Sequence, residues 1–210
     1  MIKETMNIHK ALSEVKILND RITDKIAETK FCIANKSTNK TFCGKSIEEW
    51  KNNTKSSWES INALLLRVSA IKSAINQSNA STKVSINGKE YTVAEAIYIK
   101  QYGMNYYRML LNQLRNNFAT ENRLVETKNA EEDVKATKYA TDCAGGDKAA
   151  DAEIEKIRQS YFDSHKYELV DPLDVVKQIE ILENFIDSFV SEVDSVLSVS
   201  NATTLIEIEY

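Results

Sequence analysis

Proline and glycine are scarce in this chain: its 210 residues include one proline, Pro172, and five glycines. Because these residues are the main helix breakers, their scarcity predicts long helices. No apolar run approaches the roughly twenty residues that a membrane span needs, and the N-terminal MIKETMNIHK lacks a signal-peptide core. Cys32, Cys43 and Cys143 have no paired spacing, which indicates reduced thiols and a cytoplasmic protein when synthesised.

The chain also lacks an excess of basic charge. Its net charge of −4 and pI near 5.4 argue against a nucleic-acid-binding face. Neither His9 nor His165 has partners at metal-ligand spacing, and Gly145-Gly146 lacks the Lys-Ser/Thr of a phosphate loop. Acidic residues are interleaved with lysines, so paired catalytic carboxylates are not expected. The sequence therefore predicts no catalytic residue, no cofactor and no metal site, and a protein that is not an enzyme.

What the chain does contain is a passage that occurs twice. Residues 68–86 read VSAIKSAINQSNASTKVSI, and residues 190–208 read VSEVDSVLSVSNATTLIEI. In both, an apolar period of 3.6 residues leads into Ser-Asn-Ala and then into alternating apolar residues. We therefore expect, at both places, a helix that stops at a left-handed asparagine (Asn79 or Asn201) and continues as a strand.

Amphipathic periods predict four long helices. The apolar spacing alone bounds the first helix, from Ile8 to near Phe31 or Ile33. Capping signals mark the starts of the other three: a Ser46–Glu49 capping box, a Thr92–Glu95 capping box, and Pro172 with Asp171 as N-cap. The core-facing stripe of the third helix is expected to contain Ile97, Tyr107, Leu110, Leu111, Leu114 and Phe118.

Three strand signals complete the pattern. Asn87-Gly88 predicts a type I′ hairpin that places Val84, Ile86 and Tyr91 on one face. Residues 165–170, HKYELV, alternate like a short strand, and so do residues 204–210, with Ile206, Ile208 and Tyr210 on one side. We expect the terminal strand to join the hairpin's sheet, within the subunit or by exchange with a neighbour, burying Ile206 and Ile208 beside Val84 or Ile86.

The predicted fold class is mainly α (α+β): an antiparallel bundle of long helices with a small β element at one end, formed by the Asn-Gly hairpin and the terminal strand. Residues 1–210 are expected to form a single domain. Within it, residues 119–160 favour helix but contain few large apolar side chains, with a break at Gly145-Gly146. This segment is predicted to be a protruding or mobile helical insertion.

Four segments together resemble the septicolysin-like family of small, poorly characterised bacterial and phage helical proteins. They read INQSNAST, TVAEAIYIK, YFDSHKYELVDPLDVVKQIEILENFID and SNATTLIEI. The chain departs from the family at Ala202, where the family has tryptophan, and between Arg115 and Ile157, where its connection is longer. The resemblance implies a helical protein found in bacteria and phages, and little about its chemistry.

These observations favour a non-enzymatic structural protein that forms a symmetric homo-oligomer. The family's occurrence in phages implies, as its most concrete form, a phage neck, collar or tail accessory subunit. Its partners would then be copies of itself and other virion proteins, and it would be located in the virion if phage-encoded. Nucleic acid is not an expected partner, and a membrane is not favoured. The alternatives are a septicolysin-like membrane-active protein and a small-molecule-binding cytosolic protein.

The candidate interface residues fall into two groups. Tyr98, Tyr102 and Tyr106 recur at helical spacing, which is typical either of helix packing or of a protein–protein interface. The second group comprises the strand residues Val84, Ile86, Tyr91, Ile206, Ile208 and Tyr210, because an open strand edge can accept a neighbour's strand.

Overall fold

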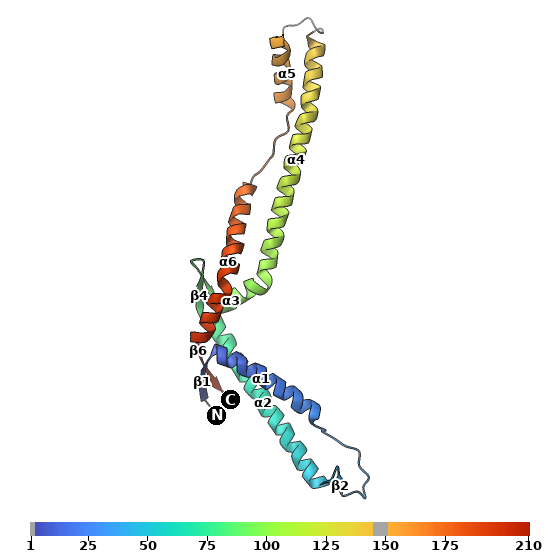
Figure 1. Ribbon diagram of the computed structural model, residues 1–210, viewed down its shortest axis with the longest axis vertical. Helices are drawn as coiled ribbons and strands as arrows, with labels where there is room; N and C mark the ends of the chain where they lie inside the picture. The colour runs from blue at the N-terminus through green and yellow to red at the C-terminus, as the bar shows by residue number, and fades with distance from the viewer. Residues whose placement is uncertain (1–2, 145–150) are drawn as a thin grey trace. The chain divides into compact units, whose positions relative to one another are not determined.

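The computed structural model describes residues 3–144 and 151–210 (Figure 1). It confirms a mainly α protein with a small β element. The helices are α1 (Ile8–Glu28), α2 (Ile47–Ser81), α3 (Val93–Tyr98), the π-helix η1 (Ile99–Gly103), α4 (Met104–Cys143), α5 (Asp151–His165) and α6 (Val175–Thr203). The strands are β1 (Lys3–Asn7), β2 (Thr41–Phe42), β3 (Lys45–Ser46), β4 (Lys83–Ile86), β5 (Lys89–Thr92) and β6 (Leu205–Glu209).

The chain divides into two units. Unit 1 comprises Met1–Gln101 and Ser188–Tyr210, and unit 2 comprises Tyr102–Asp187. Unit 2 therefore extends beyond the predicted 119–160 insertion at both ends. Within the insertion, α4 and α5 are regular helices that pack on each other. The predicted break at Gly145-Gly146 lies outside the described residues.

Unit 1 is built around the antiparallel pair α1 and α2, which lie side by side in Figure 1. Lys25 of α1 donates a hydrogen bond to Ser60 of α2, while Glu14 pairs with Arg67, so residue numbers rise along one helix as they fall along the other. The apolar faces of the two helices meet strands β1 and β6 in one buried cluster, formed by Met6, Ile8, Ala11, Val15, Leu18, Ile71, Ile75, Ile206 and Ile208.

The terminal strand does not join the hairpin's sheet, so that prediction is wrong. β6 pairs antiparallel with β1, which places Ile206 opposite Met6, and among the described residues β4 and β5 pair only with each other. Ile206 and Ile208 are buried in the cluster with Ile71 and Ile75, instead of beside the hairpin. The sequence missed β1 because this strand, KETMN, has a single large apolar side chain and so shows no alternation.

The passage that occurs twice does form a helix and then a strand at both places, as α2–β4 and α6–β6. The predicted left-handed stops are wrong, however, because Asn79 and Asn201 are helical and neither has a positive φ. The helices continue to Ser81 and Thr203. Thr82 and Thr204 then donate their backbone N–H groups to the carbonyl four residues earlier, at 2.8 and 2.9 Å.

The structural repeat extends further than the sequence repeat. After each strand pair a new helix begins, and its first residue donates its backbone N–H to the carbonyl of the residue that directly follows the preceding helix. Val93 donates to Thr82 at 2.9 Å, and Ile8 donates to Thr204 at 3.1 Å. Unit 1 thus contains the same helix–strand–strand–helix arrangement twice. The strands are joined by the Asn87-Gly88 turn in one copy and belong to opposite ends of the chain in the other.

Two predicted elements between α5 and α6 are wrong. Residues 166–170 form no strand, because no neighbouring strand pairs with them within the described chain. α6 begins at Val175 instead of Pro172. Asp171 accepts hydrogen bonds from the backbone N–H of Leu173 at 3.1 Å and of Val175 at 2.8 Å, and Asp174 has a φ of 52°. This turn delays the start of the helix.

Smaller differences concern helix ends and faces. α1 ends at Glu28, earlier than predicted, because Thr29 is already extended. At the start of α2 the Ser46 side chain accepts from the Glu49 N–H at 3.1 Å, but the Glu49 carboxylate pairs with Lys45, so the predicted capping box is only half formed. The Thr92–Glu95 capping box is complete. Leu110, expected in the core, is 49% exposed.

Candidate interaction surfaces

The hairpin residues proposed for an interface pack inside unit 1. Val84 and Tyr91 are 8% exposed and Ile86 is 1% exposed. The Tyr91 ring meets Phe189 of α6 edge-on, with ring centroids 5.8 Å apart. The turn is also attached to α6, because the Asn87 N–H donates to a Glu192 carboxylate oxygen at 2.7 Å. The apolar face of the hairpin is therefore covered by the chain itself.

The terminal strand is held in the same way. Ile206 and Ile208 are 4% and 2% exposed. The partly buried Tyr210 ring lies over the guanidinium of Arg67, 4.7 Å from its centroid, and its hydroxyl donates to Glu4 at 3.3 Å. Together these contacts leave little of the strand's apolar side for a partner.

Arg67 joins α1, α2 and β1 through one partly buried cluster of charges. It donates to Glu4 at 2.8 Å and to Glu14 at 2.5 Å. The hydrogen bond to Glu14 is the main cause that raises the pKa of Arg67, and partial burial opposes it. Since one arginine serves two carboxylates, the cluster stabilises the meeting point of three elements.

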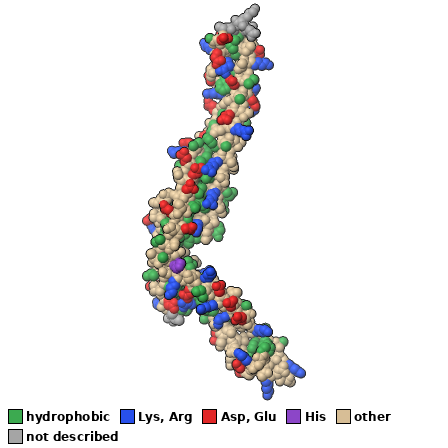
Figure 2. Space-filling model, viewed as in Figure 1, with side chains coloured by type: hydrophobic (Ala, Val, Ile, Leu, Met, Phe, Trp, Pro, Cys, Tyr) green, Lys and Arg blue, Asp and Glu red, His purple; other side chains and the backbone are tan. Residues whose placement is uncertain are grey.

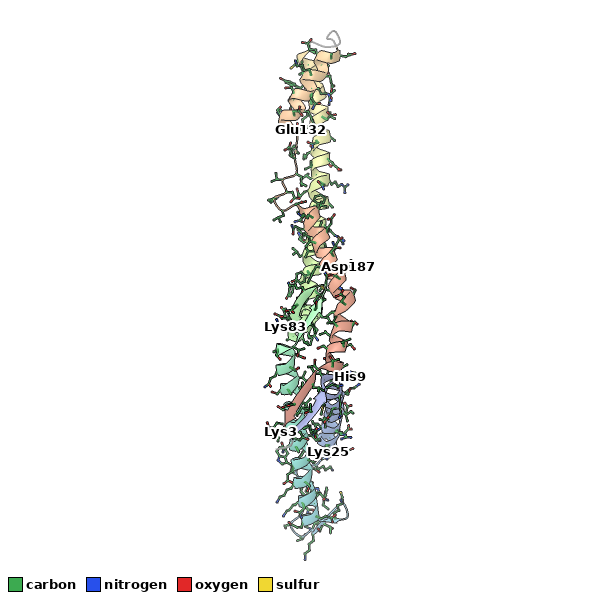
Figure 3. All side chains as sticks on the ribbon, turned by 90° about the vertical axis from the view of Figure 1, so that its left-hand side faces the viewer. Lys3, His9, Lys25, Lys83, Glu132 and Asp187 are labelled. Carbon is green, nitrogen blue, oxygen red and sulfur yellow. The ribbon has the colours of Figure 1, made fainter. Side chains whose placement is uncertain are left out.

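A small polar cavity of about 320 Å³ lies in unit 1 where α1, α3, η1 and α6 approach one another. An ion pair between Lys100 and Asp194 lies on its wall. His9, labelled in Figure 3, lines it from the first turn of α1. The remaining lining residues are Ile97, Gln101, Leu197, Ser198 and Asn201.

The second histidine, His165, lies in unit 2. His165 ends α5 and stacks on Tyr161, with ring centroids 4.0 Å apart and planes 8° apart. Tyr161 in turn lies 4.9 Å from Tyr139 of α4, and a hydrogen bond with Cys143 raises the pKa of Tyr139. Within residues 3–144 and 151–210, no three His, Cys, Asp or Glu side chains come together in a group that could hold a metal ion.

Beyond the end of α5, the extended segment is attached to α4 by one side chain. The Asn129 amide donates to the Tyr167 carbonyl at 3.0 Å, and its oxygen accepts from the Tyr167 N–H at 2.7 Å. These bonds occupy both backbone groups of Tyr167. They explain why an alternating HKYELV sequence lies along a helix here without a partner strand.

The three tyrosines behave differently from the strand residues. Tyr98 of α3, Tyr102 of η1 and Tyr106 of α4 are 58%, 59% and 68% exposed. Core packing therefore does not account for them, and they remain candidates for an interface. Hydrophobic side chains also occur elsewhere on the surface, as Figure 2 shows in green.

One face of α4, which we call the outer stripe, carries exposed residues at alternating spacings of four and three. Its members are Tyr106, Leu110, Gln113, Asn117, Thr120 and Leu124, and all of them are exposed. Leu110 and Leu124 are 49% and 47% exposed, and the adjoining Met109 is 67% exposed. Among these residues, only Tyr106 was predicted from the sequence as an interface candidate, and Leu110 was placed in the core. Counting a period of 3.5 instead of 3.6 would have found the others.

Comparison with protein-family models, curated proteins and solved structures finds no match for this chain. In the described part of the chain, no helix has the length and apolar character required to cross a membrane.

Proposed function

We propose that this protein is a non-enzymatic structural protein that assembles into a symmetric homo-oligomer. The observation that carries the proposal is the amount of apolar side chain left on the surface of helices. In unit 1, Leu66 of α2 and Val199 of α6 are 66% and 60% exposed, and in unit 2 Met109 and Val134 of α4 are 67% and 71% exposed. Adjoining exposed apolar side chains, such as Leu65 with Leu66 on α2 and Met109 with Leu110 on α4, are typical of surfaces that a partner covers.

The packing of the helices supports the same proposal. In unit 1 α1 packs on α2, and in unit 2 α4 packs on α5. Apolar side chains remain exposed on the flanks of these pairs, such as Ile17 of α1 at 52%. Burying apolar area from these flanks is favourable at about 25 cal/mol per Å².

The more specific proposal is a phage virion component such as a neck, collar or tail accessory subunit. It derives from the resemblance of INQSNAST and SNATTLIEI to the septicolysin-like family. In this role the exposed helix faces would contact other copies and further virion proteins.

Sedimentation velocity on the full chain tests the proposal. Over about 1–100 µM, which spans typical weak to moderate association, we expect a mass that is a multiple of 23.8 kDa. A single-chain mass at every concentration would refute self-assembly. Release of dye from liposomes at neutral pH would instead favour the membrane-active alternative, in which an amphipathic helix leaves its unit.

A further inference from the structure

The outer stripe of α4 has the geometry of a coiled-coil seam. Its six members follow spacings of four, three, four, three and four residues, which is the a/d pattern that keeps side chains facing a partner helix. At 1.5 Å per residue, the stripe from Tyr106 to Leu124 extends about 27 Å. The face that α4 turns inward is separate, because Leu111 is buried and Tyr107 meets Phe185 of α6 at 4.8 Å.

The composition of the stripe favours a protein partner. None of its six members carries a charge, nor does Met109 beside them, although 28% of the chain's residues are charged. Depletion of charge at the centre, with tyrosine and methionine present, is the composition typical of interface cores. Its middle is polar, because the Gln113 amide donates to the Asn117 side-chain oxygen at 3.0 Å.

The order of residues along the stripe is self-complementary. When two copies are placed antiparallel about a two-fold axis near residue 115, Tyr106 lies opposite Leu124 of the other copy. Gln113 then lies opposite Asn117, so the polar layer of one copy meets the polar layer of the other. A two-fold contact of this kind uses the same patch on both subunits, and a buried amide layer is a known means of selecting one register.

A parallel arrangement of the two α4 helices would place like charges side by side. Arg123 flanks the stripe on one side and Lys128 flanks it on the other, and in a parallel pair Arg123 of one copy would lie beside Lys128 of the second copy. The antiparallel arrangement avoids this pair and also sets the two helix dipoles in opposition, which is favourable. We therefore propose that the outer stripe of α4 is a self-association surface on which a second copy of this chain packs its own α4 antiparallel.

The available area suffices for a specific contact of moderate strength. Tyr106 and Met109 are about two thirds exposed, and Leu110 and Leu124 are about half exposed. A whole aromatic side chain buries about 150–250 Å², so these four side chains together offer on the order of 400 Å² per copy. With the polar members included, two copies would bury roughly 1,000–1,200 Å², which is above the minimum of about 1,000 Å² for a biological interface and below the standard size. Dissociation in the micromolar range is expected.

The first test is the dissociation constant measured by sedimentation. Leu110→Glu places a charge in the seam at a half-exposed position, and Asn112→Glu places the same charge on the same helix outside the stripe. We expect Leu110→Glu to raise the dissociation constant at least tenfold and Asn112→Glu to change it less than twofold. Far-UV circular dichroism of both variants should match the wild type, which separates lost association from lost folding.

This inference rests on the proposed self-assembly, but the two fail differently. A wild-type protein that stays monomeric at about 100 µM, well above the expected micromolar dissociation constant, would overturn both. If Leu110→Glu associates as tightly as the wild type, self-assembly stands and the outer stripe is not its surface.

The orientation is tested by disulfide cross-linking in a background in which Cys32, Cys43 and Cys143 are replaced by serine. Gln113→Cys protein mixed with Asn117→Cys protein should form a mixed disulfide-linked dimer under mild oxidation, because these positions face each other in the antiparallel register. Each variant alone should cross-link several-fold less. Equal cross-linking of Gln113→Cys with itself would indicate a parallel pair and overturn the orientation.

Discussion

Replacing Ile208 with alanine tests the pairing of the two ends of the chain. The Ile208 side chain is 2% exposed and lies in one cluster with Ile71 and Ile75 of α2. Alanine removes three carbons, and at about 0.8 kcal/mol per buried carbon the lost transfer free energy is about 2.4 kcal/mol. The cavity left behind adds to this, so we expect a loss of about 3–4 kcal/mol in the free energy of unfolding, within the 2–5 kcal/mol typical of such substitutions.

The assay can report on unit 1 alone. The chain's two tryptophans, Trp50 and Trp58, both lie in α2, so urea unfolding followed by tryptophan fluorescence measures the unit that contains β6. Glu207→Ala is the matched control, because this residue is exposed on the same strand and should change stability by less than about 0.5 kcal/mol.

Ile86 offers an internal comparison, since it occupies the equivalent place in the other copy of the repeat and is 1% exposed. Ile86→Ala should cost as much as Ile208→Ala. Substitutions at exposed sites change the free energy of unfolding far less than those in a core. If Ile208→Ala lowers it by less than about 1 kcal/mol, β6 is not packed on α2 and the reasoning is refuted.

Three further predictions concern local interactions in unit 1. Arg67→Ala should destabilise the unit by about 1–3 kcal/mol in the same assay, because Glu4 and Glu14 lose their shared partner; adding Glu14→Gln should restore part of the loss, and no restoration would contradict a charge effect. Gly88→Ala should cost about 1–2 kcal/mol of stability through its φ of 71° alone, because an added Cβ meets nothing within 4 Å; an unchanged urea midpoint would be inconsistent with this strain. Hydrogen bonds from the Thr92 backbone and hydroxyl lower the pKa of Glu95, so its stabilisation is present above its unfolded pKa and is lost as pH falls through the lower folded value. Between about pH 6 and pH 3, the melting temperature of the Glu95→Gln variant should therefore fall less than that of the wild type. An equal fall in both proteins would contradict a stabilising role of the ionised Glu95 cap.

The candidate surface was only partly predictable from the sequence. Tyr102 and Tyr106 were expected at an interface or in helix packing, and their exposure excludes packing alone. Leu110 and Leu111 were both assigned to the core-facing stripe, because at a period of 3.6 either can lie on the apolar face. Which of two adjacent leucines turns inward depends on where α6 lies, and that is not encoded within α4.

The sequence by itself determined the features that depend on neighbours a few residues apart. The helical periods, the Asn87-Gly88 turn and the Thr92–Glu95 capping box are of this kind, because each is made by backbone and side chains within one or two turns. The twofold helix–strand passage was readable for the same reason.

Tertiary structure alone decided which distant segments meet. β6 pairs with β1 across nearly the whole chain, although β1 offers a single large apolar residue, because α1 and α2 bring both strands onto the same apolar face. Asn79 and Asn201 are helical for a related reason. The N–H groups of Thr82 and Thr204 extend the helical hydrogen bonds past the two asparagines, and the strand that follows each threonine is held in place by its partner strand. Local preference is worth about 1 kcal/mol at such a position, and the burial of a strand's two isoleucines outweighs it.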